Sequence, residues 1–98
     1  MIEVIKSAAF ERWFGSLRDR RAQARINARI RRLSIGNPGD VRPVGSGVSE
    51  LRIDCGPGYR VYYLQRGAVL VVLLCGGDKR TQRKDIQRAI QIAAAWNR

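Results

Sequence analysis

The clearest alternation of apolar and polar positions lies in the second half of the chain. Two runs rich in Val, Ile, Tyr and Leu, residues 51–54 and 59–65, flank a Gly- and Pro-containing turn at residues 55–58. A second turn, at residues 66–67, leads into the apolar run at residues 68–75. Because Gly and Pro favour turns, and β-branched and aromatic residues favour strands, this stretch predicts three antiparallel strands in a meander.

Period-two alternation decides which side chains share a face of the middle strand. In the strand before it, Arg52 alternates with the apolar Leu51 and Ile53. Arg52 and Arg60 are therefore predicted to share one polar face if the register allows it, and the irregular turn between the strands leaves that register open. In the middle strand, the side chains expected on the face of Arg52 are Arg60, Tyr62 and Leu64. Those expected on the opposite face are Tyr59, Val61 and Tyr63.

The N-terminal part of the chain predicts a strand followed by a helix. Residues 2–5 form the strand, and Ser7 is suited to cap a helix that begins at Ala8. An aromatic stripe on this helix could stack on bases, but its i, i+3, i+4, i+7 spacing is more typical of a face packed on a core. We therefore expect it to be buried against the sheet. The stripe consists of Phe10, Trp13, Phe14 and Leu17.

A second, strongly basic helix is predicted over residues 20–33, with Asp19 as its cap. Between residues 18 and 32, seven arginines against one acid give a charge of +6. Like charges at helical spacing repel each other, so an arginine ridge indicates a phosphate backbone or an acidic partner. A solvated face that only aids solubility is the alternative. The ridge consists of Arg21, Arg25, Arg29 and Arg32, and the narrow apolar face of Ala22, Ile26, Ile30 and Leu33.

Residues 34–47 are rich in Gly and Pro and are predicted to form a loop. After the meander, Thr81 is predicted to cap a last helix that ends near Trp96. Backbone N–H groups add positive potential at the start of this helix, so basic side chains there predict a second anion site. These side chains are Lys79, Arg80, Arg83 and Lys84. The face expected to pack on the sheet is formed by Ile86, Ala89, Ile90, Ala93 and Trp96.

Composition narrows the possible partners. At 98 residues, the chain is sized for one domain, residues 1–98, with one modest core. The net charge is +11, and 16 of the 19 basic residues are arginine, which binds phosphate in a bidentate manner. RNA, DNA or an acidic protein segment is the expected partner.

No run approaches the roughly 20 apolar residues of a membrane span, and the N-terminus does not fit a signal peptide, so we expect a cytoplasmic protein without membrane contact.

The sequence also limits the chemistry. It contains no histidine, which excludes Ser–His and Cys–His nucleophile pairs and removes the commonest metal ligand. The two cysteines, Cys55 and Cys75, are too few for a disulfide framework and are expected to be free thiols. We expect no metal and no cofactor. Any catalysis would use Arg, Lys, Asp, Glu, Tyr and backbone groups.

Two segments carry a resemblance to a known family. The stretch VSELRIDCGPGYRVYY, followed by GGDKRTQRKDI, resembles the RelE/ParE superfamily of toxins from bacterial type II toxin–antitoxin modules, and within it the RelE/HigB-like addiction-module killer proteins. The resemblance covers essentially the whole chain. It implies an α+β fold of order β-α-α-β-β-β-α, in which a mainly antiparallel four-stranded sheet packs against a helical hairpin, with a C-terminal helix.

The resemblance also implies roles for particular residues. The arginine after Gly-Tyr contacts phosphate in RelE-like nucleases, and this role falls on Arg60. Arg52 is the only basic residue of the preceding strand, and Lys79 and Arg80 occupy the basic stretch after the last strand. RelE-like sites often have a tyrosine in the terminal segment, but here no tyrosine follows Tyr63. The identity of the general base is therefore open.

Cleavage of RNA by its own 2′-OH needs proton removal, stabilisation of phosphoryl charge and a proton for the leaving oxygen. Arg60 and Arg52 suit the charge term, and Lys79 is a candidate for proton exchange. Asp85 is a candidate base, as is Asp54, although each acid could instead simply pair with an arginine. Tyr62 shares the face of Arg60 and could donate a hydrogen bond or stack on a base.

Two functions stay open at this point. The first is a toxin that cuts mRNA on the ribosome without metal, inhibits translation and is neutralised by an antitoxin. That antitoxin is expected to be a helix-turn-helix protein encoded nearby. The second is a ParE-like toxin that shares the fold but poisons DNA gyrase and has no nuclease site, since fold alone does not settle function.

Overall fold

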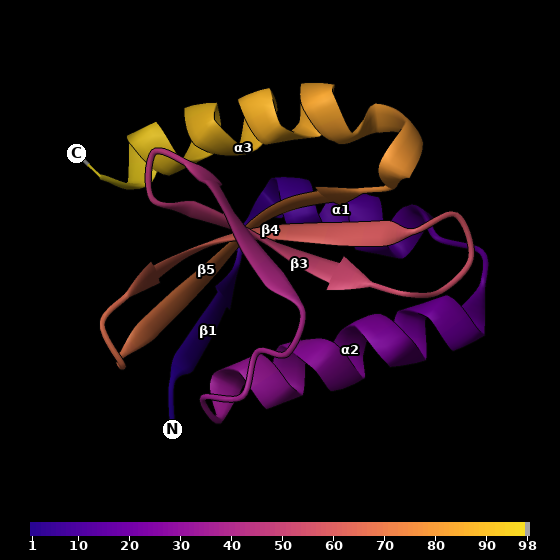
Figure 1. Ribbon diagram of the computed structural model, residues 1–98, viewed down its shortest axis with the longest axis horizontal. Helices are drawn as coiled ribbons and strands as arrows, with labels where there is room; N and C mark the ends of the chain where they lie inside the picture. The colour runs from indigo at the N-terminus through magenta and orange to yellow at the C-terminus, as the bar shows by residue number, and fades with distance from the viewer. Residues whose placement is uncertain (98) are drawn as a thin grey trace.

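The computed structural model describes residues 1–97 and has the predicted α+β class (Figure 1). Five strands form one sheet in the order β1-β5-β4-β3-β2. All neighbouring strands are antiparallel except β1 and β5, which pair in parallel. The elements are β1 (Glu3–Lys6), α1 (Ala8–Ser16), α2 (Arg20–Ser34), β2 (Val41–Gly45), β3 (Val48–Ile53), β4 (Tyr59–Arg66), β5 (Leu70–Gly77), the 3₁₀ turn η1 (Lys79–Thr81) and α3 (Gln82–Trp96).

The expected four-stranded sheet was wrong by one strand. The additional strand, β2, lies in the Gly- and Pro-rich stretch that was predicted to be a loop, and it pairs with β3. Pro43 cannot donate a hydrogen bond to a sheet, and the register shifts between Pro43 and Gly45. Both features are tolerated because β2 is an edge strand, where an unpaired proline and a bulge are common.

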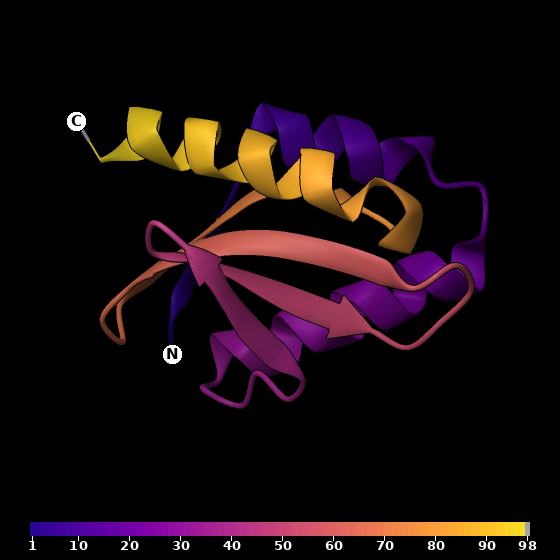
Figure 2. The same cartoon turned by 45° about the horizontal axis from the view of Figure 1, so that its top comes forward.

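Side-chain alternation along β4 is as predicted, and its two faces contribute to two hydrophobic clusters. Val61 and Tyr63 of β4 contribute to the cluster that also holds apolar residues of α1 and α2. Tyr62 and Leu64 contribute to the opposite cluster, which holds apolar residues of α3. The sheet therefore lies between α2 on one side and α3 on the other, and the second view shows the same arrangement (Figure 2).

The two N-terminal caps are confirmed. The Ser7 hydroxyl oxygen accepts a hydrogen bond from the Phe10 backbone N–H at 3.0 Å, which starts α1. The Asp19 carboxylate accepts hydrogen bonds from the backbone N–H groups of Arg21 and Ala22, at 2.9 and 3.2 Å, which starts α2. These bonds satisfy N–H groups that have no partner within the helix.

The aromatic stripe of α1 is core-facing, but its members are buried to different depths. Phe10 is 1% exposed, whereas Trp13 and Phe14 were expected to be buried and are half-buried at the edge of the same cluster. The expected burial of Ile26 and Ile30 is confirmed. Phe10, in the first turn, is the residue of α1 that is fully buried.

A Gly-Gly pair often marks a turn, but Gly76 and Gly77 belong to β5. A Cβ added to Gly76 would come within 2.2 Å of the Trp13 ring, and one added to Gly77 would come within 1.8 Å of an Asp85 carboxylate oxygen. The two glycines are therefore required because α1 and α3 lie directly against the strand on its two faces.

The C-terminal helix begins one 3₁₀ turn after the sheet. Asp78 caps that turn by accepting a hydrogen bond from the Arg80 backbone N–H at 2.8 Å. Thr81 occupies the N-cap position of α3, but it makes no side-chain capping bond, and its hydroxyl donates to Asp85 instead. Trp96 was expected to face the sheet and is 38% exposed. Within residues 1–97, no helix is both long and apolar enough to span a membrane.

The two cysteines are free thiols, as predicted, and should differ in reactivity. Cys75 is buried, and burial together with the nearby Asp85 raises its pKa to about 12. Cys55 is half-buried.

Because the thiolate is the reactive form, the native protein should react with one equivalent of a disulfide reagent and the denatured protein with two. Rapid modification of Cys75 in a native Cys55→Ser variant would contradict this expectation.

Candidate functional site

Three of the predicted catalytic residues line one hollow, called here the Arg60 cavity. Arg52 and Arg60 are direct cross-strand partners on β3 and β4, and Lys79 comes from η1. Gly58, in the turn between the strands, has φ of +82°, and a Cβ there would lie 3.4 Å from the Lys79 Cβ and 3.9 Å from Arg60 Nη1. The cavity has a volume of about 300 Å³ and is lined by Asp40, Arg52, Ile53, Asp54, Gly58, Arg60 and Lys79.

A buried carboxylate lies behind the two arginines. Glu50 is 0% exposed, and its Oε1 atom lies 3.7 Å from Arg52 Nε and 3.9 Å from Arg60 Nε. None of these three atoms has a hydrogen-bond partner, so the contact is ionic. Arg60 is itself only 7% exposed, and it lines the cavity. A carboxylate in this position offsets part of the repulsion between two adjacent guanidinium groups.

Tyr62 belongs to this buried group and not to the surface. Its ring is 0% exposed, and its hydroxyl donates a hydrogen bond to Glu50 Oε2 at 3.1 Å. Burial, followed by the neighbouring Glu50 carboxylate, raises the pKa of Tyr62, which keeps the phenol protonated as a donor. This placement excludes the predicted stacking of Tyr62 on a base, because the ring has no exposed face.

The structure does not bring Asp85 to the Arg60 cavity. Its carboxylate accepts a hydrogen bond from Thr81 and lies against Gly77. Burial raises the pKa of Asp85, and the bond from Thr81 opposes that shift. The acids that do line the cavity are Asp54, which the sequence offered as a second candidate base, and Asp40. Asp40 was missed because the stretch around it was predicted to be a loop, and no motif marks it.

The remaining basic residues near η1 are exposed. Arg80 pairs with Asp78, with Nη2 3.0 Å from Oδ2, and the hydrogen bond from the Arg80 side chain lowers the pKa of Asp78. Arg83 and Lys84 lie in the first turn of α3 with their side chains open to solvent. All three lie within five residues after Lys79 in the chain, so they continue the basic stretch from the cavity to the start of α3.

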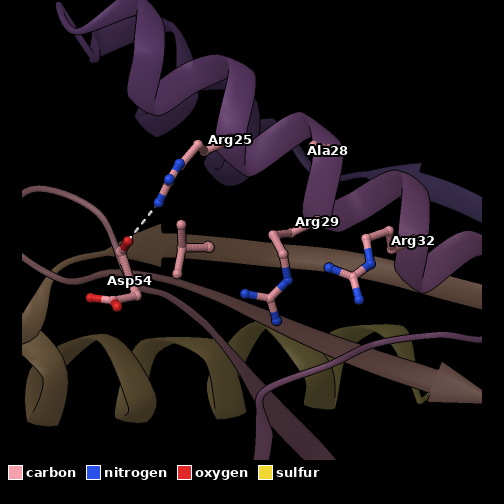
Figure 3. A pocket seen from close by; sticks show the side chains of 6 residues that line it. Arg25, Ala28, Arg29, Arg32 and Asp54 are labelled. Carbon is pink, nitrogen blue, oxygen red and sulfur yellow. Dashed lines mark hydrogen bonds between the residues drawn. The ribbon is translucent and has the colours of Figure 1, made fainter.

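The arginine ridge of α2 divides into two parts. Arg25 and Arg29 bind the end of the sheet: Arg25 Nη1 donates to the Asp54 backbone carbonyl at 2.8 Å, and Arg29 Nη1 donates to that of Arg52. Figure 3 shows Arg25, Arg29 and Arg32 extending from α2 over a hollow of about 310 Å³. This helix cavity shares Ile53 and Asp54 with the Arg60 cavity, so the two lie next to each other.

Arg29 connects α2, by hydrogen bonds, to β3 and to the segment that precedes β2. Besides its bond to β3, its Nη2 atom donates to the backbone carbonyls of Pro38 and Asp40, at 2.9 and 3.3 Å. Burial, followed by the charge of Arg32, lowers the pKa of Arg29. Gly39 lies at φ +73° with an ideal Cβ position only 3.2 Å from Arg29 Nη2, so a side chain there would be strained and would press on the guanidinium. Arg29 therefore has a structural role in placing β2.

Arg21 and Arg32 are exposed on the ridge and, unlike Arg25 and Arg29, show no hydrogen bond to the sheet within residues 1–97. If the ridge binds phosphates, the double change Arg21→Glu/Arg32→Glu should leave the fold intact and weaken binding to a nucleic-acid probe, because two phosphate contacts are lost. The slope of log affinity against log salt should fall by about 0.7–0.9 for each contact. Filter binding over a salt series would measure this slope.

The matched control for the ridge is Arg12→Glu/Arg88→Glu, which makes the same charge change at exposed positions outside α2. If the ridge binds a polyanion, the control should lose less affinity than the Arg21/Arg32 variant. Equal losses in both variants would show that only the net charge matters and would leave the ridge as a solubility feature.

Comparison with known proteins places the chain in a family. The family model described as "Phage derived protein Gp49-like (DUF891)" matches residues 12–96, which include every residue of both cavities. A protein of Haemophilus influenzae strain Rd, described only as uncharacterized, is 52% identical over 92 residues, which cover 94% of this chain and 93% of the relative. The chain therefore belongs to the phage-derived Gp49-like protein family.

Proposed function

We propose that the protein is the toxin of a type II toxin–antitoxin module and that it cuts mRNA on the ribosome. The observation that carries this proposal is the convergence of Arg52, Arg60 and Lys79 on one cavity. The resemblance of residues 48–63 and 76–86 to RelE/HigB-like toxins supports it. Three cations around a hollow of about 300 Å³ match the chemistry of a phosphodiester, because its charge is spread over several oxygens.

The proposed reaction uses the RNA's own 2′ oxygen as the nucleophile. This oxygen forms a bond to phosphorus, the bond from phosphorus to the 5′ oxygen breaks, and the products carry a 2′,3′-cyclic phosphate and a 5′-hydroxyl. Arg60 and Arg52 stabilise the negative charge that gathers on the phosphoryl oxygens. Asp54 takes the 2′ proton, and Lys79 supplies a proton to the leaving oxygen.

The exposed basic surfaces suit binding to the ribosome. The ridge residues Arg21 and Arg32, together with Arg83 and Lys84 of α3, are open to solvent and flank the elements that build the two cavities. The ribosome would orient the mRNA, which lowers the contribution required from the protein's own groups. Such a toxin acts in the cytoplasm, and its antitoxin would need acidic or phosphate-like groups to cover the same surface.

A reconstituted reaction would test the proposal. Purified protein is mixed with ribosomes that hold a defined mRNA in the decoding site, and the ends of the fragments are analysed. We expect cuts only in ribosome-bound mRNA, with 2′,3′-cyclic phosphate and 5′-hydroxyl ends. Fragments with 5′-phosphate ends would contradict the 2′-oxygen mechanism, and intact mRNA would contradict the nuclease itself.

A further inference from the structure

The buried carboxylate behind the Arg60 cavity has more partners than an ordinary ion pair. Glu50 Oε2 accepts hydrogen bonds from the Tyr62 hydroxyl at 3.1 Å and from Gln82 Nε2 at 2.8 Å. Its Oε1 atom lies between the Nε atoms of Arg52 and Arg60. Two elements besides its own strand β3, namely β4 and α3, therefore converge on one side chain that water does not reach.

We infer that Glu50 is a positioning residue, which holds Arg52 and Arg60 so that both guanidinium groups act on one phosphodiester. The inference rests on the proposed function of the cavity. It assigns no contact between Glu50 and RNA. Its effect would pass entirely through the two arginines.

The register explains why the two arginines need a carboxylate between them. Arg52 and Arg60 are direct cross-strand partners, and like charges in that relation destabilise a sheet. Glu50 lies two residues before Arg52 on the same strand face, and its own partner is Tyr62, two residues after Arg60. The carboxylate is thus diagonal to Arg60 and adjacent to Arg52, the place on this face from which it reaches both.

The hydrogen bonds fix the direction of the carboxylate. Tyr62 and Gln82 hold Oε2 from two different elements, so Oε1 is kept facing the arginines. Each arginine turns its Nε atom toward Glu50. Arg60 Nη1 lies on the cavity side, 3.9 Å from the ideal Cβ position of Gly58, which lines the cavity. A preoriented guanidinium loses less conformational freedom when it binds a phosphate.

A purely structural role for Glu50 makes a different prediction. A buried ion pair is weak evidence for stability, because removal of the charges is often tolerated. If Glu50 served only the fold, its substitution would lower the amount of folded protein, and each folded molecule would still cut RNA at the normal rate. If it positions the arginines, the rate for each folded molecule should fall.

Two substitutions and one control separate these roles. Glu50→Gln keeps the shape of the side chain and removes its charge. Gln82→Met removes one of the two bonds to Oε2 from a half-buried position, so this variant should fold even if Glu50→Gln does not. Gln87→Met makes the same change at an exposed position of α3 and should behave as wild type.

The readouts are single-turnover cleavage at saturating ribosomes, corrected for the folded fraction, and the NMR signals of arginine Nε–H groups. The Arg60 signal is assigned by its disappearance in Arg60→Lys. We expect Glu50→Gln to lose about 10- to 100-fold in rate, the range seen when groups that orient a functional side chain are removed. Gln82→Met should lose less, and in both variants the Arg60 Nε–H signal should weaken through faster exchange with water.

The outcomes separate this inference from the proposed function. Wild-type rates in folded Glu50→Gln and Gln82→Met would overturn the positioning role, as would an unchanged Arg60 signal in both. A wild-type protein that does not cut ribosome-bound mRNA would instead overturn the proposed function. The NMR comparison would then still decide whether Glu50 orders Arg60.

Discussion

Arg60→Lys is expected to fold, to bind ribosomes nearly as well as wild type and to lose about 100- to 1000-fold in cleavage rate, the cost of losing one charge-stabilising donor. Lysine keeps the positive charge beside Glu50 and so keeps the fold, but it lacks the planar fork that spans two phosphoryl oxygens. Single-turnover cleavage of ribosome-bound mRNA would measure the loss, and thermal unfolding would verify the fold.

The matched control is Arg66→Lys, the same change on the same strand at an exposed position outside the cavity, which should cut as wild type does. Arg60→Ala is a harsher test. It leaves Glu50 with Arg52, Tyr62 and Gln82, so its carboxylate is not left unpaired. The loss of stability should therefore stay below the roughly 3–5 kcal/mol typical of an uncompensated buried charge. Full toxicity in a stable Arg60→Ala protein would remove Arg60 from the mechanism.

Phe10→Ala should lower the free energy of unfolding by about 3–5 kcal/mol, as expected for truncation of a buried aromatic side chain. Phe10 is 1% exposed and lies in the cluster between α1 and the sheet, with its ring centre 5.9 Å from that of Trp13 and 5.8 Å from that of Phe14. A domain of this size is stable by only about 5–15 kcal/mol, so the variant should be largely unfolded at a moderately raised temperature. Urea denaturation followed by tryptophan fluorescence would measure the loss.

Phe14→Ala removes the same atoms from a half-buried position of the same helix and serves as the control. Because less apolar surface is exposed by this change, its loss should be clearly smaller than that of Phe10→Ala. Equal losses for the two variants would contradict the deeper burial of Phe10 in the packing of α1 on the sheet.

The parts of the fold that follow from local pattern could be predicted. Alternation along β4 placed Arg60 and Tyr62 on one face, and the caps Ser7 and Asp19 begin their helices as expected. Strand β2 could not be predicted, because its Gly and Pro residues are tolerated only at the edge of a sheet. Which strand forms the edge depends on tertiary pairing and leaves no mark in the local sequence.

The basic residues of the candidate site could be predicted from the sequence, but the positions and burial of the side chains around them could not. Arg52, Arg60 and Lys79 were named from the sequence, and the structure brings them to one cavity. The sequence did not reveal how deeply individual polar side chains are buried. The sequence does not show that Tyr62 is covered by α3, or that Arg29 binds backbone carbonyls instead of facing a partner. Burial of polar side chains depends on which elements pack together, which a single strand or helix cannot reveal.

Gly76 and Gly77 are a second case in which local sequence could not predict the contacts between elements. A Gly-Gly pair after an apolar run is a normal turn signal, and here both residues lie in a strand. Their lack of a side chain serves the close approach of Trp13 on one face and Asp85 on the other. The sequence contains all four residues, but their proximity arises only when α1 and α3 close on the sheet.

Primer extension on cellular mRNA after brief induction of the protein, with Arg60→Lys as the parallel sample, would show directly whether the protein cuts mRNA. A ribosome-dependent nuclease predicts discrete cuts in the reading frame for wild type and their absence for Arg60→Lys at equal protein levels. Intact mRNA in wild-type cells that stop growing, together with DNA damage, would contradict the nuclease and would point to gyrase as the target.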